Sequence, residues 1–108
     1  MKVYFKGKVL DKFTRVVNDS IYYFIRIYQD SQNSFIDVLL RSVPPEDSIA
    51  VKDFYNSLKT GSYALVSAVV YPRKDGKKGF NVSADILDIV LSDSNINDEE
   101  IKSLVEAL

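Results

Sequence analysis

Residues 21–29 place aromatic side chains and a cation on one face of a predicted strand. Side chains alternate between the two faces of a strand, so Tyr23, Ile25 and Ile27 share the face expected to join the core. The opposite face carries three rings and one guanidinium: Tyr22, Phe24, Arg26 and Tyr28. Exposed rings can stack on unpaired nucleic-acid bases, and neighbouring cations can meet phosphates. Alternatively, these rings pack beneath a helix or in a subunit interface.

The predicted strand Phe35–Arg41 repeats this arrangement. Its expected inward positions are aliphatic: Ile36, Val38 and Leu40. Its outward positions begin with the aromatic Phe35 and end with the cationic Arg41, with Asp37 and Leu39 between them. We therefore assign Phe35 and Arg41 to the same candidate surface.

Residues 72–79 form a second candidate site, because they join two predicted strands through a basic, glycine-containing turn. Asp75-Gly76 is a strong signal for a hairpin turn. Aromatic residues stand at both ends of a cluster of cations: Tyr71, Arg73, Lys74, Lys77, Lys78 and Phe80. Such a hairpin could close over a nucleic-acid strand and contact its phosphates, or it could simply be a solvated turn.

The composition makes an enzyme improbable. The chain has no cysteine and no histidine, which removes disulfides, thiolate metal sites and the commonest general base. Asp85, Asp88 and Asp93 are close in sequence, but Asp85 and Asp88 are expected on opposite faces of one continuous strand. No glycine-rich phosphate loop precedes a helix. We expect no catalytic residue, no metal and no cofactor.

Charge is divided along the chain. Residues 1–83 carry 13 Lys/Arg and 8 Asp/Glu, whereas residues 84–108 carry one lysine and seven acids. A basic body favours a polyanionic partner. The same division is also compatible with two solvated surfaces.

The elements that must position these residues are mostly strands. A length of 108 residues fits one domain with a single core. Alternating and β-branched segments predict five strands, and the apolar spacing of Val51, Phe54, Tyr55 and Leu58 predicts a helix over Glu46–Lys59. The strands are expected at Val3–Val9, Ile21–Gln29, Phe35–Arg41, Tyr63–Tyr71 and Phe80–Leu91. Gly7 suggests a bulge or bend in the first of them.

This order predicts an all-β fold with one or two short helices. Three strands, a helix and a closing pair of strands are the order of the five-stranded OB-fold barrel, with the helix between strands three and four. In that fold the ligand crosses the face of strands two and three. We expect the barrel over residues 1–91 and an acidic C-terminal segment over residues 92–108, which includes a short amphipathic helix.

Residues 35–91 resemble the single-stranded-DNA-binding proteins of bacteria and phages. The segment Phe35–Val38 is similar to that family's third strand, and Tyr55–Ser62 to its "YLKKGS" helix end. Residues 64–70 fit its alternating fourth strand, Arg73 with Asp75–Lys78 fits its "R…DGK" hairpin, and Asn81–Leu91 looks like its closing strand. The chain departs from the family in having no tryptophan, a shorter hairpin loop and no long linker before an acidic tip.

The resemblance implies a base-stacking role for Phe35, a phosphate-facing position for Arg73 and an aromatic contact at Phe80. It also implies a protein that coats single-stranded DNA in replication or recombination, from a phage or mobile element, and that forms a dimer or tetramer. The acidic segment would then recruit replication or recombination proteins, or pack on the barrel as a helix. With no signal peptide or membrane span, we expect a cytoplasmic location in a bacterial or phage-infected cell. The alternative is an OB-fold protein-interaction subunit of a replication or conjugation complex.

Overall fold

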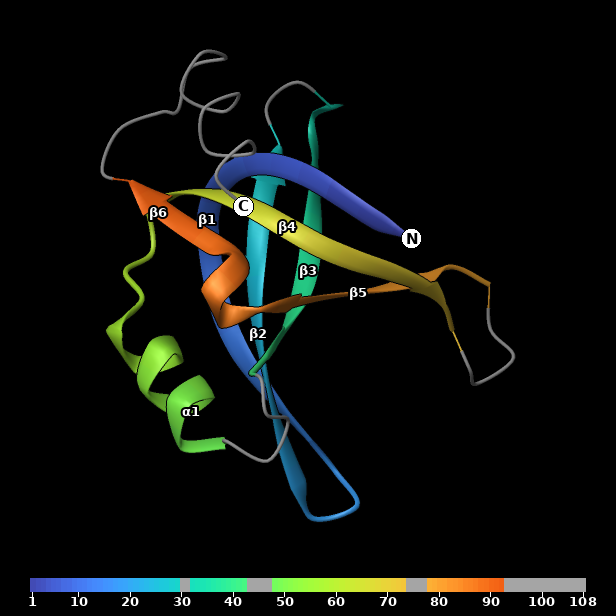
Figure 1. Cartoon of the computed structure of the whole chain (residues 1–108), viewed down its shortest axis with the longest axis vertical. Helices are drawn as coiled ribbons and strands as arrows, with labels where there is room; N and C mark the ends of the chain where they lie inside the picture. Colours follow the sequence, from blue (N-terminus) through green and yellow to red (C-terminus); the bar gives the residue numbers. More distant parts are fainter. Residues whose placement is uncertain (30–31, 43–47, 74–77, 93–108) are drawn as a thin grey trace.

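The computed structural model describes residues 1–29, 32–42, 48–73 and 78–92 as a sheet closed into a ring, with one helix (Figure 1). The elements are β1 (Lys2–Val17), β2 (Ser20–Gln29), β3 (Ser34–Arg41), α1 (Ser48–Ser57), β4 (Tyr63–Pro72), β5 (Phe80–Asp85), the 3-10 turn η2 (Ile86–Asp88) and β6 (Ile89–Ser92). The sheet order is β1-β2-β3-β5-β4-β6, and the additional β1–β4 pairing closes the ring. All neighbours are antiparallel except β3 and β5. The predicted five-stranded barrel with a helix between β3 and β4 is confirmed, and its last strand is divided into β5 and β6, which both pair with β4.

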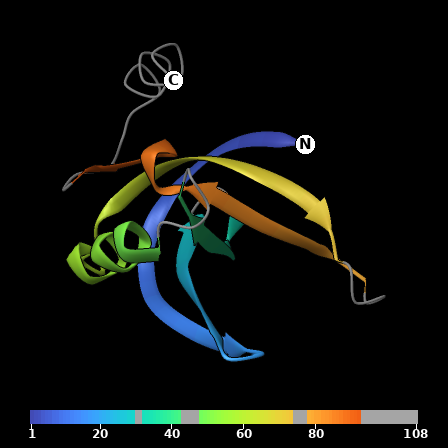
Figure 2. The ribbon, with the colours of Figure 1, turned by 60° about the horizontal axis from the view of Figure 1, so that its bottom comes forward.

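The core lies inside this ring. Ile25, Ile27 and Val38 are fully buried and Leu40 is nearly so, which confirms the predicted inward faces of β2 and β3. Val51 and Leu58 bring α1 into the same cluster. Figure 2 shows α1 lying at one end of the barrel, beside β1. Helix α1 therefore covers one end of the ring and does not cover the outer face of β2 and β3.

The first strand is much longer than the predicted Val3–Val9. Lys2–Lys8 pairs with β4, and the strand then continues to Val17 beside β2. A register shift between Val9 and Asp11 marks a bulge at Leu10. The bulge inverts the alternation of side chains, so the pattern of residues 3–9 does not continue in phase. The prediction that the strand ends at Val9 is therefore wrong.

A tight turn joins β1 to β2. Asn18 and Asp19 have φ values of 50° and 66°, as in a two-residue hairpin turn that matches strand twist. Beyond Val9 the two strands form an arm whose tip extends away from the ring (Figure 1). This arm carries aromatic and cationic side chains onto the candidate surface.

At Gly7 the backbone of β1 lies close against residues 27 and 28 of β2. A Cβ atom at this position would overlap the carbonyl oxygen of Tyr28 and lie 2.5 Å from Ile27 Cγ2. Only a residue without a side chain fits between these two backbones. Gly7 lies three residues before the bulge, around which β1 changes its pairing from β4 to β2.

Lys12 fastens the arm to the helix. Its Nζ donates a 2.8 Å hydrogen bond to the carbonyl oxygen of Tyr55 and lies 4.8 Å from the centre of the Tyr55 ring. A cation at the C-terminal end of a helix is favourably placed against the helix dipole. Lys12, which belongs to the basic N-terminal part of the sequence, is thus used to hold α1.

The prediction of one strand over Phe80–Leu91 is wrong. The turn η2 divides it into β5 and β6, and the Asp85 side chain accepts a 2.9 Å hydrogen bond from the Leu87 amide at the start of η2. Asp85 and Asp88 consequently line one hollow instead of facing opposite sides of a strand. The expected C-terminal helix lies outside the described residues. Within them, no helix is long and apolar enough to cross a membrane.

Candidate nucleic-acid interface

Two phenylalanine rings form the base of the candidate surface. Phe13 of β1 and Phe24 of β2 are opposite each other in the strand register. Their rings are nearly parallel, with centres 5.1 Å apart and an angle of 4° between planes. This geometry is a favourable aromatic stack.

Two guanidinium groups lie against these rings. The Arg15 guanidinium carbon lies 5.5 Å from the Phe13 ring centre and 5.4 Å from that of Phe24. The Arg26 guanidinium carbon lies 5.4 Å from the Phe13 ring centre and 4.6 Å from that of Phe35. All of these distances are within cation–π range. We call the five residues Phe13, Arg15, Phe24, Arg26 and Phe35 the aromatic ladder.

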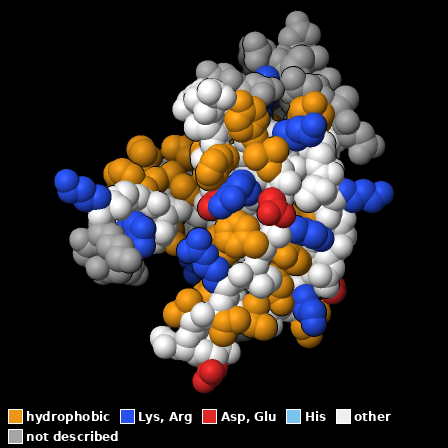
Figure 3. All heavy atoms as spheres, turned by 180° about the vertical axis from the view of Figure 1, so that it is seen from behind, with side chains coloured by type: hydrophobic (Ala, Val, Ile, Leu, Met, Phe, Trp, Pro, Cys, Tyr) orange, Lys and Arg blue, Asp and Glu red, His pale blue; other side chains and the backbone are white. Residues whose placement is uncertain are grey.

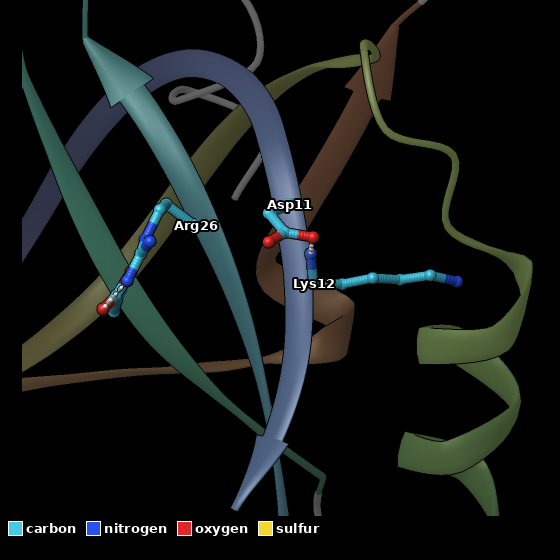
Figure 4. A network of polar contacts seen from close by, with 4 residues as sticks. Asp11, Lys12 and Arg26 are labelled. Atoms are coloured by element: carbon cyan, nitrogen blue, oxygen red, sulfur yellow. Dashed lines mark hydrogen bonds and ion pairs between the residues drawn. The ribbon is translucent and has the colours of Figure 1, made fainter.

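Arg26 is also joined to the carboxylate of Asp37 on β3. Its Nε donates to Oδ1 at 2.8 Å and its Nη2 donates to Oδ2 at 3.1 Å, which is a two-point contact between the fork and the carboxylate. The hydrogen bond and charge of Asp37 raise the pKa of the Arg26 guanidinium above its usual value. Figure 4 shows Arg26 reaching toward β3 while Lys12 points toward α1.

A groove of about 510 Å³ runs between the ladder and the β4–β5 hairpin. Its walls include Arg15, Phe24, Phe35, Tyr71, Arg73 and Phe80. Phe35 is 56% exposed and Phe80 is 68% exposed, so both rings are accessible from solvent. Hydrophobic and cationic side chains are interleaved over this face of the molecule (Figure 3). The groove can therefore accept a flexible strand that has both flat apolar groups and negative charges.

The structure brings five of the predicted site residues to this groove. Phe24, Phe35, Tyr71, Arg73 and Phe80 line it, and Arg26 joins it through Phe35. Arg73 is at the base of the hairpin, where its amide donates to the Gly79 carbonyl at 3.3 Å. Lys78 is exposed next to Gly79, whereas Lys74 and Lys77 lie outside the described residues.

The other predicted residues lie at the margins. Tyr22 and Arg41 line a neighbouring hollow of about 320 Å³ beside α1, which also includes Tyr71. Tyr28 is opposite Phe35 in the register, and its hydroxyl donates a 2.6 Å hydrogen bond to Asn33. Leu39 and Tyr71 line both hollows and thus connect the groove with the Tyr22 and Arg41 side.

Sequence reasoning missed Phe13 and Arg15. Both belong to the part of β1 beyond the bulge, where no strand was predicted. A signal was present, because Phe13, Arg15 and Val17 alternate with Lys12, Thr14 and Val16. The alternation becomes visible only when it is counted from Asp11 instead of being continued from Val3.

A further hollow of about 370 Å³ lies on the outer face of β4 and β5. Lys2, Arg41, Asp85 and Asp88 place charges of both signs around it. Ser67, which is 2% exposed, also lines it, and its hydroxyl has no hydrogen-bond partner within the described structure. No group of three or more potential metal-binding side chains occurs in the described part of the chain.

The closed ring with its helix between β3 and β4 defines the class of fold as an OB barrel. The sequence matches no protein-family model and no curated protein. Among solved structures, the mitochondrial single-stranded DNA-binding protein Rim1 of S. cerevisiae is similar, with a TM-score of 0.53 and 16% identity over 88% of this chain and 98% of that chain. The small single-stranded DNA-binding protein of Streptomyces coelicolor is similar with a TM-score of 0.53 and 15% identity, over 85% of this chain and 92% of that chain. These two proteins therefore share the OB fold that was predicted from the sequence of this chain.

Proposed function

We propose that this protein binds single-stranded DNA in the groove, with little dependence on base sequence, and that it is a binding protein without a cofactor or catalytic residue. The observation that carries the proposal is the meeting of ladder and hairpin around one groove of about 510 Å³. Unpaired bases would stack on Phe35 and Phe80, and phosphates would meet Arg15, Arg73 and Lys78. The shared fold of two proteins named for binding single-stranded DNA supports the same conclusion.

Stacking explains the expected preference for single strands. In a duplex the faces of the bases are already covered by neighbouring base pairs, so exposed rings have nothing to stack on. The same rings accept any base, because every base has a flat face. Sequence-tolerant binding with weak duplex binding follows.

The proposal is tested by titrating fluorescently labelled oligo(dT) with the protein at several salt concentrations. We expect the logarithm of the association constant to fall linearly with the logarithm of salt, with a slope of about −0.7 for each phosphate contacted. A duplex of equal length should bind much more weakly. Equal or tighter duplex binding would contradict the proposal. Absent or salt-insensitive binding would favour the alternative, in which the aromatic face contacts a protein.

We further propose that the protein coats and protects single-stranded DNA during replication or recombination, in the cytoplasm of a bacterium or phage-infected cell. The motivation is the resemblance of residues 35–91 to bacterial and phage single-stranded-DNA-binding proteins. A protein of this kind acts by covering DNA, so nuclease protection of long single strands is the activity to measure.

Self-association into a dimer or tetramer is also proposed. The Lys2–Lys8 part of β1 pairs with β4, and β2 joins β1 only from Lys8 onward. Among the described residues, the start of β1 is therefore a sheet edge on its other side. Such edges commonly pair with another chain. Light scattering at micromolar concentration should give a multiple of the 12.3 kDa chain mass. A monomer mass would contradict this prediction.

Residues 92–108 are proposed to be dispensable for DNA binding. They carry five acidic residues and one lysine, so their charge opposes contact with phosphates. Removing residues 96–108 should leave oligo(dT) binding equal or slightly tighter, with the largest effect at low salt because salt screens the repulsion. Unchanged thermal stability would support a tail that recruits replication or recombination proteins, whereas a large loss would support a packed helix. Loss of DNA binding in a folded truncated protein would contradict both.

A further inference from the structure

We propose that Asp37 is a positioning residue for DNA binding, acting through Arg26, and that Arg15 supplies the ladder's phosphate contact. The Arg26–Asp37 pair carries no net charge, and its guanidinium supports the Phe35 ring in a position where a base can stack on it. The inference rests on the proposed function, because it assigns roles within the same groove. It differs from the simpler expectation that Arg26 binds phosphate.

The presence of Asp37 is otherwise unexpected. A carboxylate lies in the middle of a face proposed to receive a polyanion, and its side chain is 29% exposed. Electrostatics alone would make this residue unfavourable for DNA binding. Its two hydrogen bonds to Arg26 give it a different role: the charge of each group is compensated by the other.

The two contacts also fix the plane of the guanidinium. A guanidinium can hydrogen-bond in its own plane while its flat faces stack on aromatic rings. Arg26 does both, with Asp37 at its edge and the Phe13 and Phe35 rings within cation–π distance. Phe35 is thereby supported by Arg26, while more than half of its surface remains open to solvent. A ring held in this way loses little freedom when a base stacks on it.

Arg15 differs from Arg26 in its charge environment. It lies within cation–π distance of the Phe13 and Phe24 rings and lines the groove. No carboxylate of the described residues forms an ion pair with it. The positive charge of Arg15 therefore remains available for a phosphate. The charge of Arg26, in contrast, is compensated by Asp37.

The test compares four variants of the full chain by oligo(dT) titration: Asp37→Asn, Arg26→Gln, the double variant and Arg15→Gln. Binding is measured across a salt series and at about 1 M salt, where the screening length is about 3 Å and stacking dominates. Asp53→Asn on α1 is the matched control, because it removes the same charge from an exposed residue outside the groove. Circular dichroism establishes that each variant is folded, and Asp37→Glu provides a second variant that keeps the carboxylate.

At about 1 M salt we expect Asp37→Asn and Arg26→Gln each to weaken binding about three- to tenfold, as for partial loss of one stacking contact. The double variant should bind like Arg26→Gln alone, because Asp37 acts only through Arg26. For the double variant, the slope of the logarithm of the association constant against the logarithm of salt should equal that of the unchanged protein, because the two removed charges cancel. Arg15→Gln should reduce the magnitude of the slope by about 0.7. Asp53→Asn should bind normally, and Asp37→Glu should bind better than Asp37→Asn.

Several results would overturn the inference. A simple charge effect predicts that Asp37→Asn binds more tightly and that the two single changes are additive. A phosphate-binding Arg26 predicts that the double variant loses as much slope as Arg15→Gln. Either outcome would contradict a positioning role.

A measurement without DNA separates failure of this inference from failure of the proposed function. The Arg26 Nε–H signal in nuclear magnetic resonance should be shifted by the two rings and slow to exchange, and it should lose both properties in Asp37→Asn. If these properties are absent in the unchanged protein, the positioning role is wrong even when DNA binds. If they are present and oligo(dT) does not bind, the proposed function is wrong and the claim that Asp37 orders Arg26 remains.

Discussion

Replacing Phe35 with alanine is expected to weaken oligo(dT) binding about ten- to a hundredfold, since base–aromatic stacking contributes about 1–3 kcal/mol. The effect should be large because Phe35 is the exposed end of the ladder and faces the groove. Stability should change little, because the ring is 56% exposed and its loss creates no cavity in the core. The measurement is an oligo(dT) titration together with thermal unfolding.

The matched control for this change is Leu87→Ala. Leu87 is also a large exposed apolar residue, 77% exposed on η2, and it does not line the groove. It should bind oligo(dT) normally. Phe35→Tyr, which keeps an aromatic ring, should bind within a few fold of the unchanged protein. Normal binding by Phe35→Ala would show that the bases lie elsewhere.

The largest expected effect on stability comes from Gly7→Ala. The added Cβ would overlap the carbonyl oxygen of Tyr28, so the β1 and β2 backbones must move apart beside the fully buried Val9 and Ile27. Overpacking of this kind costs about 1–3 kcal/mol and can cost more, which corresponds to a fall in melting temperature of roughly 4–8 °C for each kcal/mol. We expect a loss of about 2–4 kcal/mol on this basis. Chemical denaturation measures it directly.

Lys8→Ala is the control for Gly7→Ala. It changes the next residue of the same strand, whose side chain is exposed, and should alter the free energy of unfolding by about 0.5 kcal/mol or less. A Gly7→Ala protein as stable as the Lys8→Ala protein would contradict the close approach of β1 and β2.

Much of the candidate site could be predicted because β2 and β3 are regular. Their alternation places Ile25 and Val38 inside and Phe24 and Phe35 outside, and the structure agrees. The helix was predicted from its apolar spacing, although it ends at Ser57, two residues before the expected Lys59. These features depend on local periodicity alone.

The rest depended on irregularities or on pairing between distant segments. The bulge at Leu10 hid the strand that carries Phe13 and Arg15, and η2 hid the change of direction between Asp85 and Ile89. The pairing of Arg26 with Asp37 needs the β2–β3 register, which brings the two residues directly opposite. Alternation placed both residues outward but did not reveal that they neutralise each other.

The closure of the ring has a consequence for the order of folding. The β1–β2–β3 meander, which contains the whole ladder, forms between neighbouring segments, whereas the β1–β4 pairing joins Lys2 to Val69. Contacts between segments so distant in sequence form slowly, because the entropy of loop closure precedes the gain from pairing. During synthesis the ladder residues therefore leave the ribosome before the hairpin that supplies the opposite wall. A nascent chain will therefore expose its stacking rings before the groove has formed. The groove can enclose a DNA strand only after β1 has paired with β4.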